Sequence, residues 1–393
     1  MSTKSKTATA KAGRKERSVM SPAAPLGFVS ILRRELPTIC GLATTAVVYG
    51  LGQRWMHDFS NLAFTAAVFV GLFTVMVWCA FGVVRHAEAL AQYCGEPYGT
   101  LILTMSVVAI EVTIMATVML TGDPNPTLPR DTVYAVAMIV LNGMVGASVI
   151  VGALRHKQQQ YSLQGAVAFL AVITSLSVIS LIIPTFTKST PDSSVTPMQA
   201  VAFAILTTLL YGGFLLIQTM RHRTFFMEAD AVEEAGHEGG APVYPAWTHA
   251  LLLVLTLLPV VLLAEPLALI VDFGLEKLHA PAPLGGIVIA ILVLSPEGLS
   301  SLRAASQNHL QRSVNLSLGS ALSTIGLTIP AMLLISLITG TPLQLGLAPA
   351  DAILLGVTLM IAQMTFSGAP TNILLGGVHL VLFATFVVLI FSP

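Results

Sequence analysis

The sequence predicts an all-helical membrane protein with about eleven spans, arranged as two inverted-topology five-helix repeats after one N-terminal helix. Of its 393 residues, 55% are hydrophobic and only 10% are charged, whereas a soluble domain carries about 25% charged residues. Its apolar residues fall into runs of the length that a bilayer requires. Finally, Glu111 and Glu297 each lie alone inside such a run, one in each half of the chain.

The chain divides into four parts. Residues 1–35 form a basic arm without the apolar core of a cleaved signal peptide. Residues 36–220 form the first membrane half, 221–246 an acidic loop, and 247–393 the second membrane half. The predicted spans are Leu36–Trp55, Leu62–Val84, Tyr98–Thr121, Thr132–Leu154, Leu163–Thr187, Met198–Met220, Trp247–Val271, Leu284–Leu302, Val314–Gly340, Ala350–Phe366 and Asn372–Phe391.

The charges between the spans predict the orientation. With the N-terminus in the cytoplasm, the inner connections hold Arg85, Arg155, Lys157, Arg221, Arg223, Arg303 and Arg312. The outer connections hold only Arg54, Arg130, Lys188 and Lys277, one in each. This distribution follows the positive-inside rule. It makes the Glu111 and Glu297 spans run in opposite directions, as matched segments of an inverted repeat must.

The long loop from Arg221 to Ala246 joins the two halves on the cytoplasmic side. It holds two histidines and five acidic side chains, among them Glu233 and Glu234. Such a run is usually a solvated linker. Capture or sensing of cations by these side chains is an alternative that the sequence leaves open.

Glu111 and Glu297 are the first candidates for function. A carboxylate at membrane depth is costly and usually faces a bundle interior or a water-filled path for ions or protons. Pro296, directly before Glu297, has no N–H for the carbonyl of Leu292, so we expect an interrupted helix with free backbone oxygens beside the carboxylate. The simpler alternative is that each glutamate only bonds a neighbouring helix.

Small and polar residues in the spans that follow are candidate ligands. Asn142 follows the Glu111 span, and Gly319, Ser320 and Ser323 follow the Glu297 span. Hydroxyl, amide and carbonyl oxygens suit a hard cation such as calcium, although small residues also serve close helix packing. Glu88 and Glu96 lie near the cytoplasmic ends of spans two and three. These two glutamates could line a vestibule to the site. The alternative is that they are solvated residues at helix ends, and this interpretation also explains His86.

Several motifs are absent from the sequence. It has no G-x-x-x-x-G-K-[ST] phosphate loop for ATP, no H-E-x-x-H zinc motif and no G-x-S-x-G nucleophile elbow. A T-V-G-Y-G selectivity filter is missing as well. The zero net charge gives no general attraction to nucleic acid. We therefore expect no cofactor, no use of ATP and no enzymatic activity.

Two segments carry a resemblance to a known family. S-P-E-G-L-S-S-L-R-A-A, followed by N-L-S-L-G-S-A-L-S-T-I-G-L-T-I-P, resembles the second conserved repeat of the cation/proton exchangers, a branch of the calcium:cation antiporter superfamily. G-E-P-Y-G-T-L-I-L-T-M-S-V-V-A-I-E-V resembles the first repeat of its bacterial calcium/sodium–proton antiporters. The ending S-G-A-P-T-N-I-L-L-G-G-V-H-L resembles the last span of the family, so the resemblance covers essentially the whole membrane region.

The resemblance implies roles for particular residues. Glu111 and Glu297 correspond to the paired acidic residues that bind cation and proton alternately. Gly319 and Ser320 match the Gly-Ser of the second repeat, and Asn142 falls where the first repeat has its small-residue pair. The chain departs from many relatives by having Val107-Val108-Ala109 and Ser295-Pro296 before the two glutamates, which removes amide oxygens near the carboxylates.

The function expected from these observations is secondary active antiport. A cytoplasmic cation (calcium, sodium or potassium) would leave in exchange for external protons, across the inner membrane of a bacterium. The partners would be membrane lipid, inorganic cations and protons, with a homo-oligomer compatible with this function. A cation channel lined by the same carboxylates is the alternative. A membrane enzyme that uses them as an acid/base pair is a weaker one.

Overall fold

The computed structural model describes residues 28–51, 59–94, 98–121, 125–190, 194–221, 223–226, 243–281 and 283–392. Residues 1–27 of the predicted arm and most of the predicted acidic loop lie outside this part. Within it, regular structure is helical apart from two isolated bridges, which join Gln159 to Thr371 and Ser194 to Gln344. The prediction of an all-helical chain is therefore confirmed.

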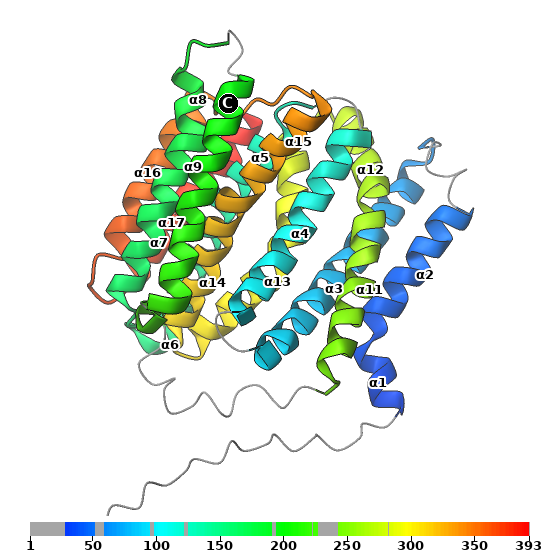
Figure 1. Cartoon of the computed structure of the whole chain (residues 1–393), viewed down its shortest axis with the longest axis horizontal. Helices are drawn as coiled ribbons and strands as arrows, with labels where there is room; N and C mark the ends of the chain where they lie inside the picture. Colours follow the sequence, from blue (N-terminus) through cyan, green and yellow to red (C-terminus); the bar gives the residue numbers. More distant parts are fainter. Residues whose placement is uncertain are drawn as a thin grey trace, which may run out of the picture.

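The helices stand side by side in one bundle (Figure 1). They are α1 (Phe28–Arg34), α2 (Leu36–Leu51), α3 (Leu62–Cys94), α4 (Tyr98–Thr121), α5 (Leu128–Met138), η2 (Ile139–Met144), α6 (Val145–His156), α7 (Leu163–Ser177), η3 (Val178–Ile182), α8 (Ile183–Phe186), α9 (Pro197–Leu216), η4 (Ile217–Arg221), η5 (Arg223–Phe226), α11 (Ala246–Leu262), α12 (Ala264–Lys277), α13 (Pro283–Ser306), α14 (Leu310–Ser323), η6 (Thr324–Thr328), α15 (Ile329–Thr339), α16 (Pro349–Thr365) and α17 (Ile373–Phe391).

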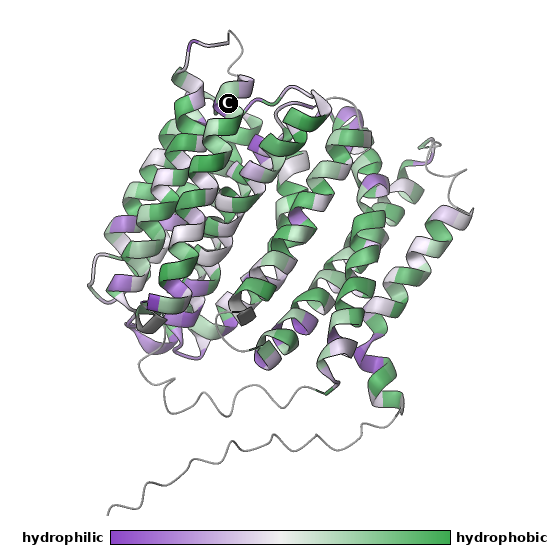
Figure 2. Ribbon diagram, viewed as in Figure 1, coloured by the Kyte–Doolittle hydropathy of each residue, from purple (hydrophilic) through white to green (hydrophobic). Residues whose placement is uncertain are grey.

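The helices have the length and composition of membrane spans. Within the described ranges, eight continuous helical stretches are long and apolar enough to cross a membrane, and three shorter apolar helices cover Leu36–Gly50, Thr104–Leu120 and Pro349–Thr365. Hydrophobic residues cover most of their ribbons (Figure 2). Each predicted span overlaps one of these helices, so a polytopic membrane protein is confirmed. That all eleven cross the bilayer stays a prediction.

Local sequence signals set several helix ends. Thr196 caps α9 in a capping box with Gln199, and Pro197 occupies the first turn, where its missing N–H costs nothing. The Asn372 side chain accepts hydrogen bonds from two backbone N–H groups at the start of α17. At the other end of a helix, Gly340 has a φ of 71° after α15, a conformation that favours glycine.

Two hydrophobic cores divide the bundle. One joins side chains of α2, α3, α11 and α12 with Leu128 at the start of α5, and the other joins α5 to α7 and α9 with α14 to α17. The helices α4 and α13 contribute to both: Ile110 and Leu292 belong to the first core, and Met115 and Leu294 to the second. The two helices that carry the membrane glutamates therefore lie at the boundary between the cores.

Two π-helical segments hold equivalent places in the two halves. The segment η2 interrupts the helix after α4, and η6 interrupts the helix after α13. Such π segments are rare and occur often at functional sites. The interruption expected at Pro296 is wrong, because α13 continues through it. Neighbouring helices support α13 on several sides, and packing of this kind lets a membrane helix tolerate proline.

Most helices of the bundle end at one of two opposite faces. We call the face where α2 and α11 begin and α3 ends the proximal face, and the opposite one the distal face. In Figure 1 the proximal face is at the bottom, and the C-terminus lies at the top, on the distal face.

Candidate functional site

Glu111 lies in the middle of α4 and is buried, with 1% of its surface exposed. Its Oε2 accepts hydrogen bonds from the hydroxyl groups of Thr324 and Thr328, each over 2.9 Å. Its Oε1 is also buried but makes no hydrogen bond within the described part of the chain. Thus one oxygen of the Glu111 carboxylate is held by residues of the second half of the chain, and the other has no hydrogen-bond partner among the described residues.

The π segment η6 places both threonines toward Glu111. Threonine in a helix commonly donates to the carbonyl four residues earlier, as Thr207 does to Phe203 and Thr256 does to Leu252. Thr324 and Thr328 instead donate across to α4. Gly326 lies between them, and a Cβ there would come within 2.7 Å of the Tyr211 ring. Glycine is therefore needed for α9 to pack this closely on the segment.

Glu297 lies in α13 and borders a cavity of about 460 Å³. Its side chain is largely buried, and its Oε2 makes no hydrogen bond to any residue described. Gln218, Phe226 and Arg312 also line the cavity. They belong to η4, η5 and the first turn of α14, which lie at the proximal face (Figure 1). The cavity therefore extends from Glu297 toward that face.

Three residues of α14 that the sequence offers as candidate ligands lie at the same cavity as Glu297. Gly319, Ser320 and Ser323 all line it. The Ser320 hydroxyl is buried and makes no hydrogen bond in the described ranges, while Ser323 donates to the carbonyl of Ser320 over 3.0 Å. Ser320 Oγ and Glu297 Oε2 are thus unpaired oxygens on one cavity, of the type that a hard cation requires.

The charge of Glu111 acts on Glu297. They come from opposite halves of the chain, as an inverted repeat with a shared site requires. Glu297 lines the cavity, whereas Glu111 does not. Two like charges in a buried site repel each other strongly, so the pair favours a cation or a proton between its carboxylates.

Asn142 has a different environment from the one expected of a ligand. It is fully buried in η2 and is not among the residues that line the cavity. Its amide donates to Thr358 Oγ1 over 2.8 Å, and its Oδ1 lies 3.1 Å from His379 Nδ1. The other ring nitrogen of His379 lies 3.0 Å from Thr365 Oγ1. This network ties η2 to α16 and α17.

The two vestibule candidates differ in what the structure says of them. Glu88 is exposed on α3, and the charge of Arg312, which lines the cavity, acts on it. Glu96 lies outside the described residues.

Thr328 was missed from the sequence, and Thr324 was not singled out there. Their spacing of four residues in an apolar helix is the signal that could have identified them.

A second group of ionisable residues lies apart from this site, at the proximal face. Glu35, between α1 and α2, bonds Arg85 over 2.9 Å and lies 3.1 Å from His86 Nε2. His86 is fully buried, so the solvated helix end expected there is wrong. Its Nδ1 lies 3.0 Å from His249 Nδ1 in α11. Long-range packing of α2 and α11 on α3 covers His86, which its own sequence neighbours do not reveal.

The environment of Glu35 favours its charged form. Burial raises the pKa of this carboxyl, but the hydrogen bond to His86, the charge of Arg85 and the Tyr244 hydroxyl together lower it below 4.5. Tyr244 donates to Glu35 Oε1 over 3.2 Å, and burial together with the Glu35 charge raises the pKa of this phenol. The group holds the start of α2 against α3 and α11.

Comparisons with known proteins agree with this architecture. Solved structures of similar fold include native YfkE, with a TM-score of 0.70 at 16% identity, covering 91% of this chain and all of that one. Another is the H⁺/Ca²⁺ exchanger CAX, with a TM-score of 0.67 at 13% identity, covering 92% of this chain and 89% of that one. At such identities the likeness concerns the fold alone.

Two relatives are closer in sequence. The sodium-potassium/proton antiporter ChaA of Escherichia coli is 38% identical over 316 residues, which are 80% of this chain and 86% of ChaA. The putative ionic transporter y4hA of Sinorhizobium fredii is 42% identical over 322 residues, 81% and 87% of the two chains. The family model described as sodium/calcium exchanger protein matches residues 64–220 and 248–392. The chain therefore belongs to the sodium/calcium exchanger protein family.

Proposed function

We propose that the protein is a secondary active antiporter that exports a cation from the cytoplasm in exchange for protons. The observation that carries this proposal is the pairing of Glu111 with Glu297. They are buried carboxylates from opposite halves of the chain, and the charge of Glu111 acts on Glu297. Of the two, Glu297 lines the cavity. The names of the relatives support the same class of function.

Competition for the same oxygens would couple the two fluxes. A bare charge in a buried site is costly, so the pair is stabilised by a bound cation or by bound protons. A cation that reaches Glu297 through the cavity would displace protons and recruit Glu111 Oε1 and Ser320 Oγ. The helices at the boundary between the two cores would then rearrange and open the site to the distal face, as in alternating access. No ATP is needed in this cycle.

Thr324 and Thr328 would serve both stages. A hydroxyl group has one proton to donate and two lone pairs. With no cation bound, both groups donate to Glu111 Oε2, as they do in the structure. With a cation bound beside Glu111, rotation of either hydroxyl would present a lone pair to the ion instead.

The transported ion belongs to the hard cations. Carboxylate, hydroxyl and carbonyl oxygens suit calcium. Sodium and potassium are hard cations too and bind ligands of the same type. One relative is named for sodium and potassium, and others are named for calcium. We propose sodium or calcium as the principal substrate, with potassium as a third candidate. The roles of Gly319 and Ser323 as ligands belong to the same proposal. For Asn142, which bonds Thr358 and His379, we expect a packing role, with ligation of the cation as the alternative.

The location proposed is the inner membrane of a bacterium, with the proximal face toward the cytoplasm. The positive residues that the sequence places inside support this orientation, since Arg155 and Arg221 lie at proximal helix ends. Contact with lipid follows from the apolar outer surface of the helices. A homo-oligomer and a regulatory role for the acidic loop are compatible with the proposal.

Inside-out vesicles with an acidic interior test the function. Sodium, potassium or calcium is added separately, and dissipation of the pH gradient is recorded for wild type, Glu111→Gln and Glu297→Gln. We expect at least one cation to dissipate the gradient with wild type and not with either variant. Glu276→Gln, an exposed carboxylate on α12, is the matched control. Cation flux without proton movement would favour a channel and contradict the proposal.

A further inference from the structure

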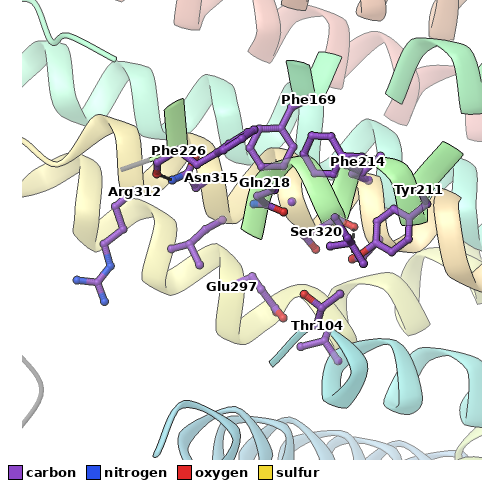
Figure 3. A pocket seen from close by; sticks show the side chains of 16 residues that line it. Thr104, Phe169, Tyr211, Phe214, Gln218, Phe226, Glu297, Arg312, Asn315 and Ser320 are labelled. Carbon is purple, nitrogen blue, oxygen red and sulfur yellow. Dashed lines mark hydrogen bonds between the residues drawn. The ribbon is translucent and has the colours of Figure 1, made fainter. Parts of the chain in front are cut away.

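The cavity beside Glu297 has an aromatic wall. Phe169, Phe214, Phe226 and Tyr211 all line it. The three phenylalanine rings pack on one another with centroids 5.0 to 5.7 Å apart. They lie across the cavity from Glu297, and Gln218 lies between (Figure 3). An inorganic ion gains little from most of this wall, because its ligands are oxygens.

The size of the cavity also exceeds what one inorganic ion requires. Its volume of about 460 Å³ falls within the range of roughly 300–1,000 Å³ that is typical of small-molecule sites. Such sites combine apolar and aromatic walls with a few convergent polar groups. The cavity has this composition, and Glu297 is the only carboxylate among the described residues that line it.

Two acceptors at one end of the cavity are unpaired. Glu297 Oε2 and Ser320 Oγ are buried and make no hydrogen bonds within the described ranges. An alkylammonium group offers three N–H donors and a positive charge, so it can satisfy both acceptors at once. Arg312 lies at the outer end of the cavity, where its charge acts on Glu88. The positive end of a ligand is therefore favoured at Glu297.

We propose that this cavity binds organic ammonium ions that carry an aromatic or other apolar group. The ammonium lies against Glu297 and Ser320, and the apolar group lies against Phe214 and Phe226. An aromatic group on the ligand gains further attraction by packing against these rings. Such a ligand occupies the route from the proximal face to Glu297. We therefore expect the bound ligand to block ion exchange, and this expectation rests on the proposed function. The binding of the ligand does not depend on that function.

Calorimetry on the purified full chain tests binding with three matched probes at pH 7. The probe 2-phenylethylammonium has both features, 2-phenylethanol lacks the charge, and ethylammonium lacks the ring. We expect 2-phenylethylammonium to bind at least tenfold more tightly than either of the others. Glu297→Gln should abolish its binding, and Phe214→Leu should weaken it about threefold to tenfold, since a pair of aromatic rings gains roughly this factor beyond the area that it buries. Phe273→Leu, in α12 away from the cavity, should have no effect.

Two results would overturn the inference. One is equal binding of ethylammonium and 2-phenylethylammonium, which would make the cavity an aqueous vestibule. The other is binding that survives Glu297→Gln in a variant with an unchanged unfolding temperature, which would place the ligand elsewhere. Tracer sodium or calcium flux, measured separately, should be inhibited by 2-phenylethylammonium. If no exchange occurs but charge-dependent binding is lost in Glu297→Gln, the proposed function fails and this inference stands.

Discussion

Thr324 of η6 donates its hydroxyl proton to Glu111 of α4 over 2.9 Å, although the two residues are 213 positions apart in the chain. Thr328 donates to the same oxygen over the same distance. Because α4 belongs to the first half and η6 to the second, the two halves complete one site between them. Any rearrangement of α4 against η6 must break these two bonds.

Removal of either hydroxyl should impair ion exchange. Thr324→Val and Thr328→Val each leave Glu111 Oε2 with a single donor, and loss of a hydrogen bond to a charged group costs about 1.5–3 kcal/mol. We expect the initial rate of cation-dependent proton movement to fall about tenfold or more. Thr324→Ser keeps a hydroxyl and should restore most of the rate. Unchanged rates in both valine variants would show that these bonds play no part in transport.

The role of Asn142 can be decided by measuring the affinity for the cation and the stability of the protein separately. Its side chain bonds Thr358 and His379, so Asn142→Ala should leave buried polar groups unpaired at a cost of roughly 1–3 kcal/mol each. We expect a lower unfolding temperature and an unchanged cation KM in the folded fraction. A rise in KM without loss of stability would instead identify Asn142 as a ligand.

Gly326 should tolerate no side chain. A Cβ at this position would lie 2.7 Å from the Tyr211 ring, and overpacking of a core typically costs about 1–3 kcal/mol. We expect Gly326→Ala to lower the unfolding temperature in detergent. Gly212→Ala in α9, where nothing lies within 4 Å of the new Cβ, is the matched control and should leave it unchanged or raise it. Equal unfolding temperatures of the two variants would contradict the packing of α9 on η6.

Glu35 should make stability depend on pH in the acidic range. Its pKa in the folded chain lies below the ordinary value of 4.5, so its contribution is complete above about 4.5 and is lost as the pH falls through the folded value. We expect Glu35→Gln to unfold at a lower temperature than wild type at pH 7. Scans from pH 7 to 3 should show this difference shrinking below pH 4.5. A difference that is constant with pH would contradict the ionised role of Glu35.

Much of the architecture was predictable, because membrane spans are encoded locally. An apolar run of about 20 residues predicts a helix wherever it occurs, and each predicted span overlaps a helix of the structure. Pro296 is the exception. It predicted an interruption from local stereochemistry, yet α13 continues through it because neighbouring helices support it.

The candidate site was predictable only in part. Lone carboxylates in apolar runs identified Glu111 and Glu297, since burial of an uncompensated charge is costly at any position in a membrane. The residues around them depend on how helices turn toward one another. The π segments η2 and η6 change the direction in which the side chains of the following residues point. No residue type in the sequence predicts such a segment. The contrast between Asn142, held by His379, and Thr324, bound to Glu111, is therefore a property of packing.

The sequence alone determined that this chain is a polytopic helical membrane protein with one special carboxylate in each half, since hydropathy and the cost of buried charge act residue by residue. Only the tertiary structure decided which oxygens are paired. It placed Glu111 against two threonines and Glu297 at an open cavity with an aromatic wall. It also buried His86 between helices that are far apart in the chain. These pairings depend on contacts across the whole bundle, which hydropathy and local spacing do not specify.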